Sequence, residues 1–196
     1  MKNIALFGTS ADPPTAAHQA IMRWLANRYD WVAVWASNNP FKSHQTSLEH
    51  RHEMLGLLIG EIETPRQNIR VYEELSSSRS LETVGKAKEI WVNGEQFILV
   101  IGADLVTQMP RWYRIGELLQ EVELLVVPRL GYEIKERDLE ELRQLGATVA
   151  IADLNAPPVS STAYRENGDR DALTPPVAEY IYQAQLYACQ KGTPSR

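Results

Sequence analysis

Residues 3–18 read NIALFGTSADPPTAAH, and this stretch decides the fold. It begins with a continuous apolar run, which is typical of a strand buried on both faces. Gly8 ends the run, where a residue without a Cβ lets the backbone approach a ligand closely. Asp12 and two prolines then lead into a helix, whose first amides are free and whose dipole favours an anion. The stretch therefore predicts a strand, a turn and a helix that can hold a phosphate.

Thr15 and His18 lie three residues apart at the start of this helix, so they share one face of its first turn. Both side chains can then reach a phosphate bound at the helix start. The alternative is an ordinary strand–turn–helix with a histidine on its surface. The stretch by itself leaves both interpretations open.

Similar apolar runs recur along the chain, separated by amphipathic segments. They predict strands at residues 3–7, 31–36, 69–72, 97–102, 122–128 and 147–152. The segments between and after them predict helices at residues 16–28, 48–60, 81–92, 115–120, 135–145 and 174–188. This alternation indicates an α/β fold with a mostly parallel sheet. Ligands in such folds bind beyond the carboxyl ends of the strands, where the strand order reverses.

Length and charge restrict the class of protein. The chain has 196 residues, so we expect a single domain over residues 1–196. Its formal charge is -5 and it has no basic stripe, so nucleic acid is not an expected partner. The first apolar run is too short for a signal peptide or a membrane span, and the single cysteine, Cys189, has no internal disulfide partner. We expect a cytoplasmic protein that does not contact membranes.

A second anion site is suggested near the C-terminus, where residues 160–165 read SSTAYR after two prolines. Hydroxyl side chains there can cap a helix start, and Arg165 lies one turn along on the same face. Free amides, hydroxyls and a guanidinium together suit a polyphosphate. Taken alone, the segment is equally a capped helix with a solvated arginine.

The two motifs in this order resemble the nucleotidylyltransferase superfamily, with its (H/T)xGH sequence after the first strand and its (I/V)SSTxxR sequence before a late helix. The middle of the chain resembles bacterial nicotinate-mononucleotide adenylyltransferases. The segments that carry this resemblance are NNPFK at 38–42, EHRHEML at 49–55, LETV at 81–84, IGAD at 101–104, PRWY at 110–113, PRLGY at 128–132 and PPVAEYI at 175–181.

The resemblance implies a Rossmann-like three-layer sandwich with a mostly parallel sheet. It also implies an enzyme of NAD biosynthesis that transfers AMP from ATP to nicotinate mononucleotide and releases pyrophosphate. Mg²⁺ would accompany the ATP, and no metal site formed by the protein is expected. The small-molecule partners would be ATP and nicotinate mononucleotide, and the sequence does not decide between a monomer and a homo-oligomer.

The family's roles carry over to matching positions of this chain. The residues expected at ATP are Gly8, Thr9, Ser10, Thr15, His18, Gly102, Asp104, Ser160, Ser161, Thr162 and Arg165. Those expected at the mononucleotide are Asn38 (or Asn39, since the register is open), Lys42, Thr83, Trp112, Tyr113 and Arg129. His18, Lys42 and Arg165 would be catalytic, because they supply positive charge or N–H donors to the phosphates. The indole of Trp112 would stack on the pyridine ring, and backbone amides would meet its carboxylate.

Three departures from the family pattern leave alternatives open. Thr15 stands where this family has His. Thr is the usual residue at this position in pantetheine-phosphate adenylyltransferases, which are the alternative enzyme. Ala17 stands where Gly is expected, and Phe41 replaces a His. The added methyl of Ala17 either pushes the nucleotide outward or fills space left by the smaller Thr15 and Ala11. A catalytically weakened nucleotide-binding regulatory protein is the alternative from another class.

Overall fold

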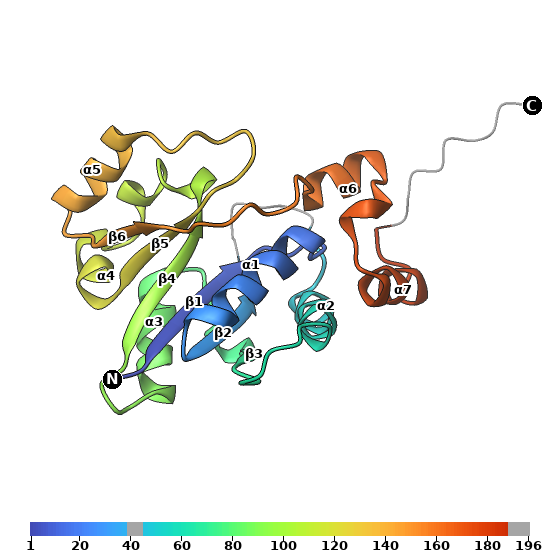
Figure 1. Cartoon of the computed structure of the whole chain (residues 1–196), viewed down its shortest axis with the longest axis horizontal. Helices are drawn as coiled ribbons and strands as arrows, with labels where there is room; N and C mark the ends of the chain where they lie inside the picture. The colour runs from blue at the N-terminus through green and yellow to red at the C-terminus, as the bar shows by residue number, and fades with distance from the viewer. Residues whose placement is uncertain (39–44, 188–196) are drawn as a thin grey trace, which may run out of the picture.

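The computed structural model describes residues 1–38 and 45–187. Its sheet has six strands in the order β3-β2-β1-β4-β5-β6, and every neighbouring pair is parallel (Figure 1). The strands are β1 (Asn3–Thr9), β2 (Trp31–Ala36), β3 (Ile69–Val71), β4 (Gln96–Gly102), β5 (Glu123–Val127) and β6 (Val149–Ile151). The predicted α/β class and parallel sheet are confirmed.

Seven α-helices connect or follow these strands. They are α1 (Ala16–Arg28), α2 (Leu48–Gly60), α3 (Ser80–Ile90), α4 (Ile115–Glu121), α5 (Glu136–Gln144), α6 (Ser161–Asn167) and α7 (Pro175–Gln183). Four 3₁₀ helices, which the sequence did not predict, are η1 (Glu73–Leu75), η2 (Ala103–Leu105), η3 (Met109–Arg111) and η4 (Arg170–Ala172).

The helices form layers on both faces of the sheet, and alternation along each strand explains why. Ile4 and Leu6 of β1 lie in a buried cluster with side chains of α3, α4 and α5. Ala5 and Phe7 point to the other face, where the cluster includes side chains of α1, α2 and α7. Successive side chains of a strand point to opposite faces, so a continuous apolar run supplies both cores. The result is the expected three-layer sandwich (Figure 1).

The last helix is shorter than the sequence predicted. A helix over 174–188 was expected, but α7 ends at Gln183. Beyond it, Gln185 and Tyr187 take left-handed backbone conformations, with φ of 52° and 50°. This turn directs Tyr187 toward the loop after β1, where its hydroxyl donates a hydrogen bond to Asp12. A tertiary contact therefore replaces the last helical turn.

The order of the strands places the site. From β1 the chain moves outward through β2 and β3 to one edge, and from β4 it moves through β5 and β6 to the other. The carboxyl ends of β1 and β4 therefore flank the point where the order reverses, which is the usual ligand crevice of such sheets. Among the described residues, no helix is long and apolar enough to cross a membrane.

Candidate functional site

The loop after β1 holds His18 in a defined orientation at the start of α1. Thr15 is the N-cap residue, and its backbone N–H donates to His18 Nδ1 at 3.0 Å. The Thr15 hydroxyl oxygen lies 2.9 Å from the same nitrogen. Because Nδ1 accepts from an amide, the ring proton must be on Nε2. His18 therefore has an N–H donor on the ring nitrogen that Thr15 does not use.

The charge state of His18 follows from its surroundings. Burial, with a smaller contribution from the positive charge of Arg129, lowers the pKa of His18 to about 4. The imidazole is therefore neutral at pH 7 and donates through Nε2 without carrying a charge. Thr15 itself is fully buried. In this structure it positions His18, and its direct contact with ATP stays a prediction.

The second predicted phosphate motif lies against the first. Ser160 is the N-cap of α6, and its hydroxyl oxygen accepts from the Ala163 N–H at 3.1 Å. Ser161 Oγ donates to the carbonyl of Pro13 at 2.7 Å. The guanidinium of Arg165 donates to the carbonyl of Asp12. Two motifs about 150 residues apart in sequence are thus in direct contact, and polar groups of the second motif hold the loop of the first.

Thr162 is exposed at the start of α6, as is Arg165 one turn along. Thr9 and Ser10 line the same end of β1, where the Thr9 carbonyl accepts from the Ser37 N–H at 2.7 Å. The loop after β1 and the loop after β2 are thereby joined directly.

A buried arginine, Arg51 of α2, donates hydrogen bonds to the loops after β1 and β2. Its Nη1 donates to the carbonyls of Ser10 and Ser37, each at 2.9 Å. Its Nε donates to the carbonyl of Thr46 at 2.8 Å. Arg51 is only 2% exposed, and its partners here are carbonyl oxygens. It therefore fixes the backbone around the site, a role that the sequence analysis did not assign.

Two glycines let side chains approach the strand ends. A Cβ on Gly8 would lie 2.5 Å from the ring of Trp35, so only glycine fits there. A Cβ on Gly102 would lie 2.5 Å from the carboxylate of Asp104. Asp104 also forms an ion pair with Arg129, at 2.9 Å. An open, shallow hollow of about 500 Å³ lies beside Asp104, between the segment after β4 and the loop after β5.

Arg129 therefore lies between the two expected ends of the site. The resemblance placed it with the mononucleotide and Asp104 with adenosine. The structure pairs the two side chains, and the charge of Arg129 also acts on the pKa of His18. Gly102 of β4 is paired with Val127 of β5, so Asp104 and Arg129, each two residues further along the chain, come close together.

The groups expected to recognise the pyridine lie near the start of α3 and in the segment after β4. Thr83 is buried. Its hydroxyl donates to the carbonyl of Leu75 at 3.0 Å, and its N–H donates to the carbonyl of Arg79 at 3.2 Å. Trp112 is partly buried against the core, and Tyr113 is 47% exposed.

Thr83 lies in the first turn of α3, where free backbone amides were expected. Since its hydroxyl and its amide are both used within the protein, Thr83 is a structural residue here. Among the described residues, the amides of Ser80 and Leu81 at the start of α3 have no acceptor, as is usual for the first turn of a helix. The helix was predicted to start at Leu81, one residue after its observed start at Ser80, so the Ser80 amide was not expected to be free.

The segment after β2 is only partly described. Asn38 is exposed just beyond the end of β2. The predictions on Asn39, Phe41 and Lys42 lie outside the described residues.

Comparisons with known proteins agree with this geometry. Residues 6–167 match the family described as cytidylyltransferase-like. The chain is 44% identical to a probable nicotinate-nucleotide adenylyltransferase of Synechocystis, over 94% of this chain and 98% of that one. The chain belongs to the nicotinate-nucleotide adenylyltransferase family.

More distant members of the family align over nearly the same length. The nicotinate-nucleotide adenylyltransferase of Bacillus subtilis is 28% identical over 95% of this chain and 99% of its own. A Plasmodium falciparum nicotinic acid mononucleotide adenylyltransferase, solved in complex with NaAD, is 21% identical and covers 96% of this chain and 98% of that one. Its TM-score of 0.81 shows that the fold is shared.

Proposed function

We propose that this member of the nicotinate-nucleotide adenylyltransferase family transfers AMP from ATP to nicotinate mononucleotide, in the cytoplasm. The observation that carries the proposal is the neutral, oriented His18 at the crevice where the two phosphate motifs meet. The family membership of the whole chain supports the choice of acceptor.

The reaction needs no general base, because the 5′-phosphate of the mononucleotide is already an anion at neutral pH. One of its oxygens forms a bond to the α-phosphorus of ATP, and the bond from that phosphorus to the bridging oxygen breaks. Pyrophosphate leaves with the electron pair of that bond. Catalysis then consists of positioning and of stabilising charge that develops on the phosphoryl oxygens.

The described residues supply these effects in distinct ways. His18 Nε2–H donates to developing charge, and it costs no reorganisation because Thr15 already fixes the ring. Arg165 and the start of α6 add positive potential at the leaving pyrophosphate. Lys42 is proposed to act on the phosphates from the loop after β2.

A divalent cation is proposed to enter with ATP. Among the described residues, no group of three or more His, Cys, Asp or Glu side chains could hold a metal ion. The carboxylate of Asp104, at the strand ends, is engaged by Arg129. We propose that Mg²⁺ is held mainly by the ATP phosphates, where it would neutralise charge on the leaving pyrophosphate.

The test is pyrophosphate release from ATP by the purified protein with three acceptors: nicotinate mononucleotide, phosphopantetheine and none. We expect release that depends on nicotinate mononucleotide, with stoichiometric formation of the dinucleotide. Equal release with phosphopantetheine would favour the alternative enzyme. Nucleotide binding without release under any condition would favour a regulatory protein.

A further inference from the structure

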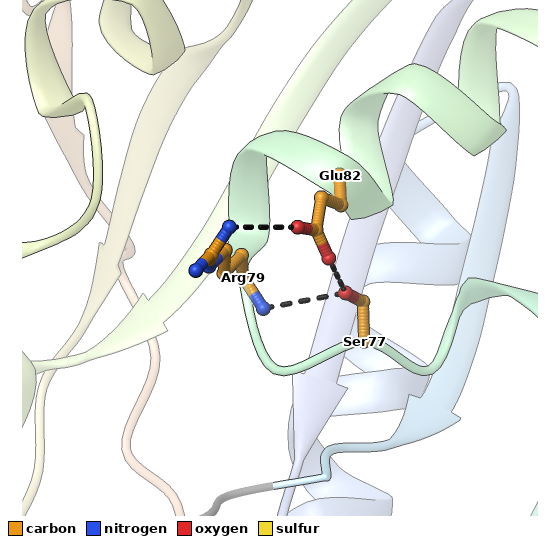
Figure 2. Close-up of polar contacts among 3 residues, drawn as sticks. All are labelled: Ser77, Arg79 and Glu82. Carbon is orange, nitrogen blue, oxygen red and sulfur yellow. Dashed lines mark hydrogen bonds and ion pairs between the residues drawn. The ribbon is translucent and has the colours of Figure 1, made fainter.

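Arg79 lies directly before α3, and its guanidinium stacks on the ring of Tyr113. Its Cζ is 4.2 Å from the ring centroid. Figure 2 shows Arg79 facing Glu82, with Nη1 and Oε1 3.3 Å apart. Ser77 donates to the other oxygen of that carboxylate at 2.6 Å and accepts the Arg79 N–H at 3.3 Å (Figure 2). The guanidinium is therefore held on one side by an ion pair and on the other by an aromatic face.

This arrangement joins the two elements expected to surround the pyridine ring. Tyr113 follows Trp112 in the segment after β4, whereas Arg79 precedes the free amides of α3. The stacking contact therefore brings the start of α3 to the Trp112–Tyr113 segment. Among the described residues, Glu82 is the hydrogen-bond acceptor of the guanidinium, and the side chain is 49% exposed. Its other N–H groups have no hydrogen-bond acceptor within residues 1–38 and 45–187.

We propose that Arg79 is a specificity-determining residue, whose positive charge beside Tyr113 selects a pyridine carboxylate over a pyridine carboxamide. The proposal rests on the proposed function, and it deepens that function by naming a side chain that reads the charge of the acceptor. A guanidinium suits a carboxylate in both charge and shape. A carboxamide is neutral and gains little from it.

The ion pair with Glu82 strengthens the argument. Without Arg79, the Glu82 carboxylate would stand uncompensated at the start of α3. A like charge opposes binding of an anionic ring substituent, whereas it affects a carboxamide much less. Removal of Arg79 should therefore weaken the use of nicotinate mononucleotide and leave that of nicotinamide mononucleotide nearly unchanged.

The experiment compares kcat/KM for nicotinate and nicotinamide mononucleotide in the wild type, Arg79→Gln, Arg79→Lys and Arg114→Gln. Arg114 is the matched control, because its guanidinium is 5.9 Å from the same ring and is paired with Glu117. Each preference ratio is measured at low and high salt, since screening weakens a partly exposed charge. Circular dichroism checks that each variant is folded.

We expect Arg79→Gln to lower the preference for nicotinate mononucleotide by about ten-fold, the size of one lost charge contact near the surface. Arg79→Lys should retain most of the preference, Arg114→Gln should leave it within about two-fold, and salt should reduce it in the wild type. An unchanged ratio in Arg79→Gln, an equal fall in Arg114→Gln or a salt-independent wild-type ratio would overturn the proposal. A wild type that adenylylates neither acceptor would overturn the proposed function itself.

Discussion

The contact between Thr15 and His18 shows how one hydrogen bond can orient a proposed catalytic group. The Thr15 amide binds Nδ1, so the proton remains on Nε2. A residue at the N-cap of a helix often uses its side chain to satisfy backbone groups of the first turn. Here the side chain at N3, His18, accepts a hydrogen bond from the N-cap amide of Thr15, and this bond restricts rotation of the ring. The same contact that begins α1 therefore orients the proposed donor.

Replacing His18 tests this at the residue scale. His18→Ala should lower kcat by about a hundred- to a thousand-fold, with a much smaller change in ATP binding, because the donor acts mainly in the transition state. Measurements of kcat and of ATP affinity check this expectation. A variant with nearly normal kcat would remove His18 from the mechanism.

The lowered pKa also predicts a pH dependence of stability. The pKa of His18 is about 4 in the folded protein, against 6.5 as the ordinary value. Between these values the unfolded chain binds more protons, so the free energy of unfolding falls as the pH falls through this range. Urea unfolding should show a steeper loss for the wild type than for His18→Asn, which cannot titrate. Parallel curves for the two proteins would contradict the assignment.

At the scale of elements, the site is assembled from segments that approach from three directions. The carbonyls of Asp12 and Pro13 accept hydrogen bonds from α6, and Arg51 of α2 holds the carbonyl of Ser10. The segment after α7 adds the hydroxyl of Tyr187, which binds the Asp12 side chain. The loop after β1 is therefore held by contacts from α2, α6 and the segment after α7.

Tyr187→Phe isolates the contribution of the segment after α7. The variant keeps the ring, which packs edge-on against Tyr164, and removes the hydroxyl, which donates to Asp12 and also interacts with Thr46. A hydrogen bond to a carboxylate is worth about 1.5–3 kcal/mol, so the free energy of unfolding should fall by about that amount. The KM for ATP should rise as well, because Asp12 belongs to the loop at the expected phosphate site.

Urea unfolding of Tyr187→Phe and of the control Tyr182→Phe measures this effect. Tyr182 lies on α7 and is 81% exposed, so its hydroxyl should contribute almost nothing. Equal stability of the two variants would show that the bond to Asp12 has no energetic role.

At the scale of the whole molecule, the reversal of strand order places the expected ligand crevice between the two halves of the sheet. The β1–β2–β3 half carries the loop with His18, and the β4–β5–β6 half carries Asp104 and Arg129. A dinucleotide in the crevice would contact both halves at once. Because such a ligand binds the folded chain alone, it should stabilise the domain by mass action.

Thermal unfolding with added dinucleotide measures this coupling. At a concentration about a hundred times Kd, nicotinate adenine dinucleotide should contribute about 2.7 kcal/mol, which corresponds to a rise in Tm of roughly 5–10 °C. Pyrophosphate at the same concentration is the control, and its effect should be smaller, because it reaches only the phosphate motifs. A Tm that does not respond to the dinucleotide would argue against a preformed site across the two halves.

The sequence by itself determined the class of fold, the order of its main elements and the two phosphate motifs. Strands buried on both faces need continuous apolar runs, and amphipathic helices need a different periodicity, so both patterns can be read locally. The bounds of α1 and α2 agree with the expected residues for this reason. Trp35 of β2 is 5% exposed, as expected for a strand that is buried on both faces. The motif residues could be named because their order along the chain resembles a known family.

Only the tertiary structure decided which polar groups remain available to a ligand. The hydroxyl and the amide of Thr83 donate to the carbonyls of Leu75 and Arg79. The stacking of Arg79 on Tyr113 has no local signature in the sequence. The end of α7 depends on a bond between Tyr187 and a residue 175 positions earlier. Such contacts form only when distant segments fold together, because a donor is satisfied by whichever acceptor the packing brings within reach.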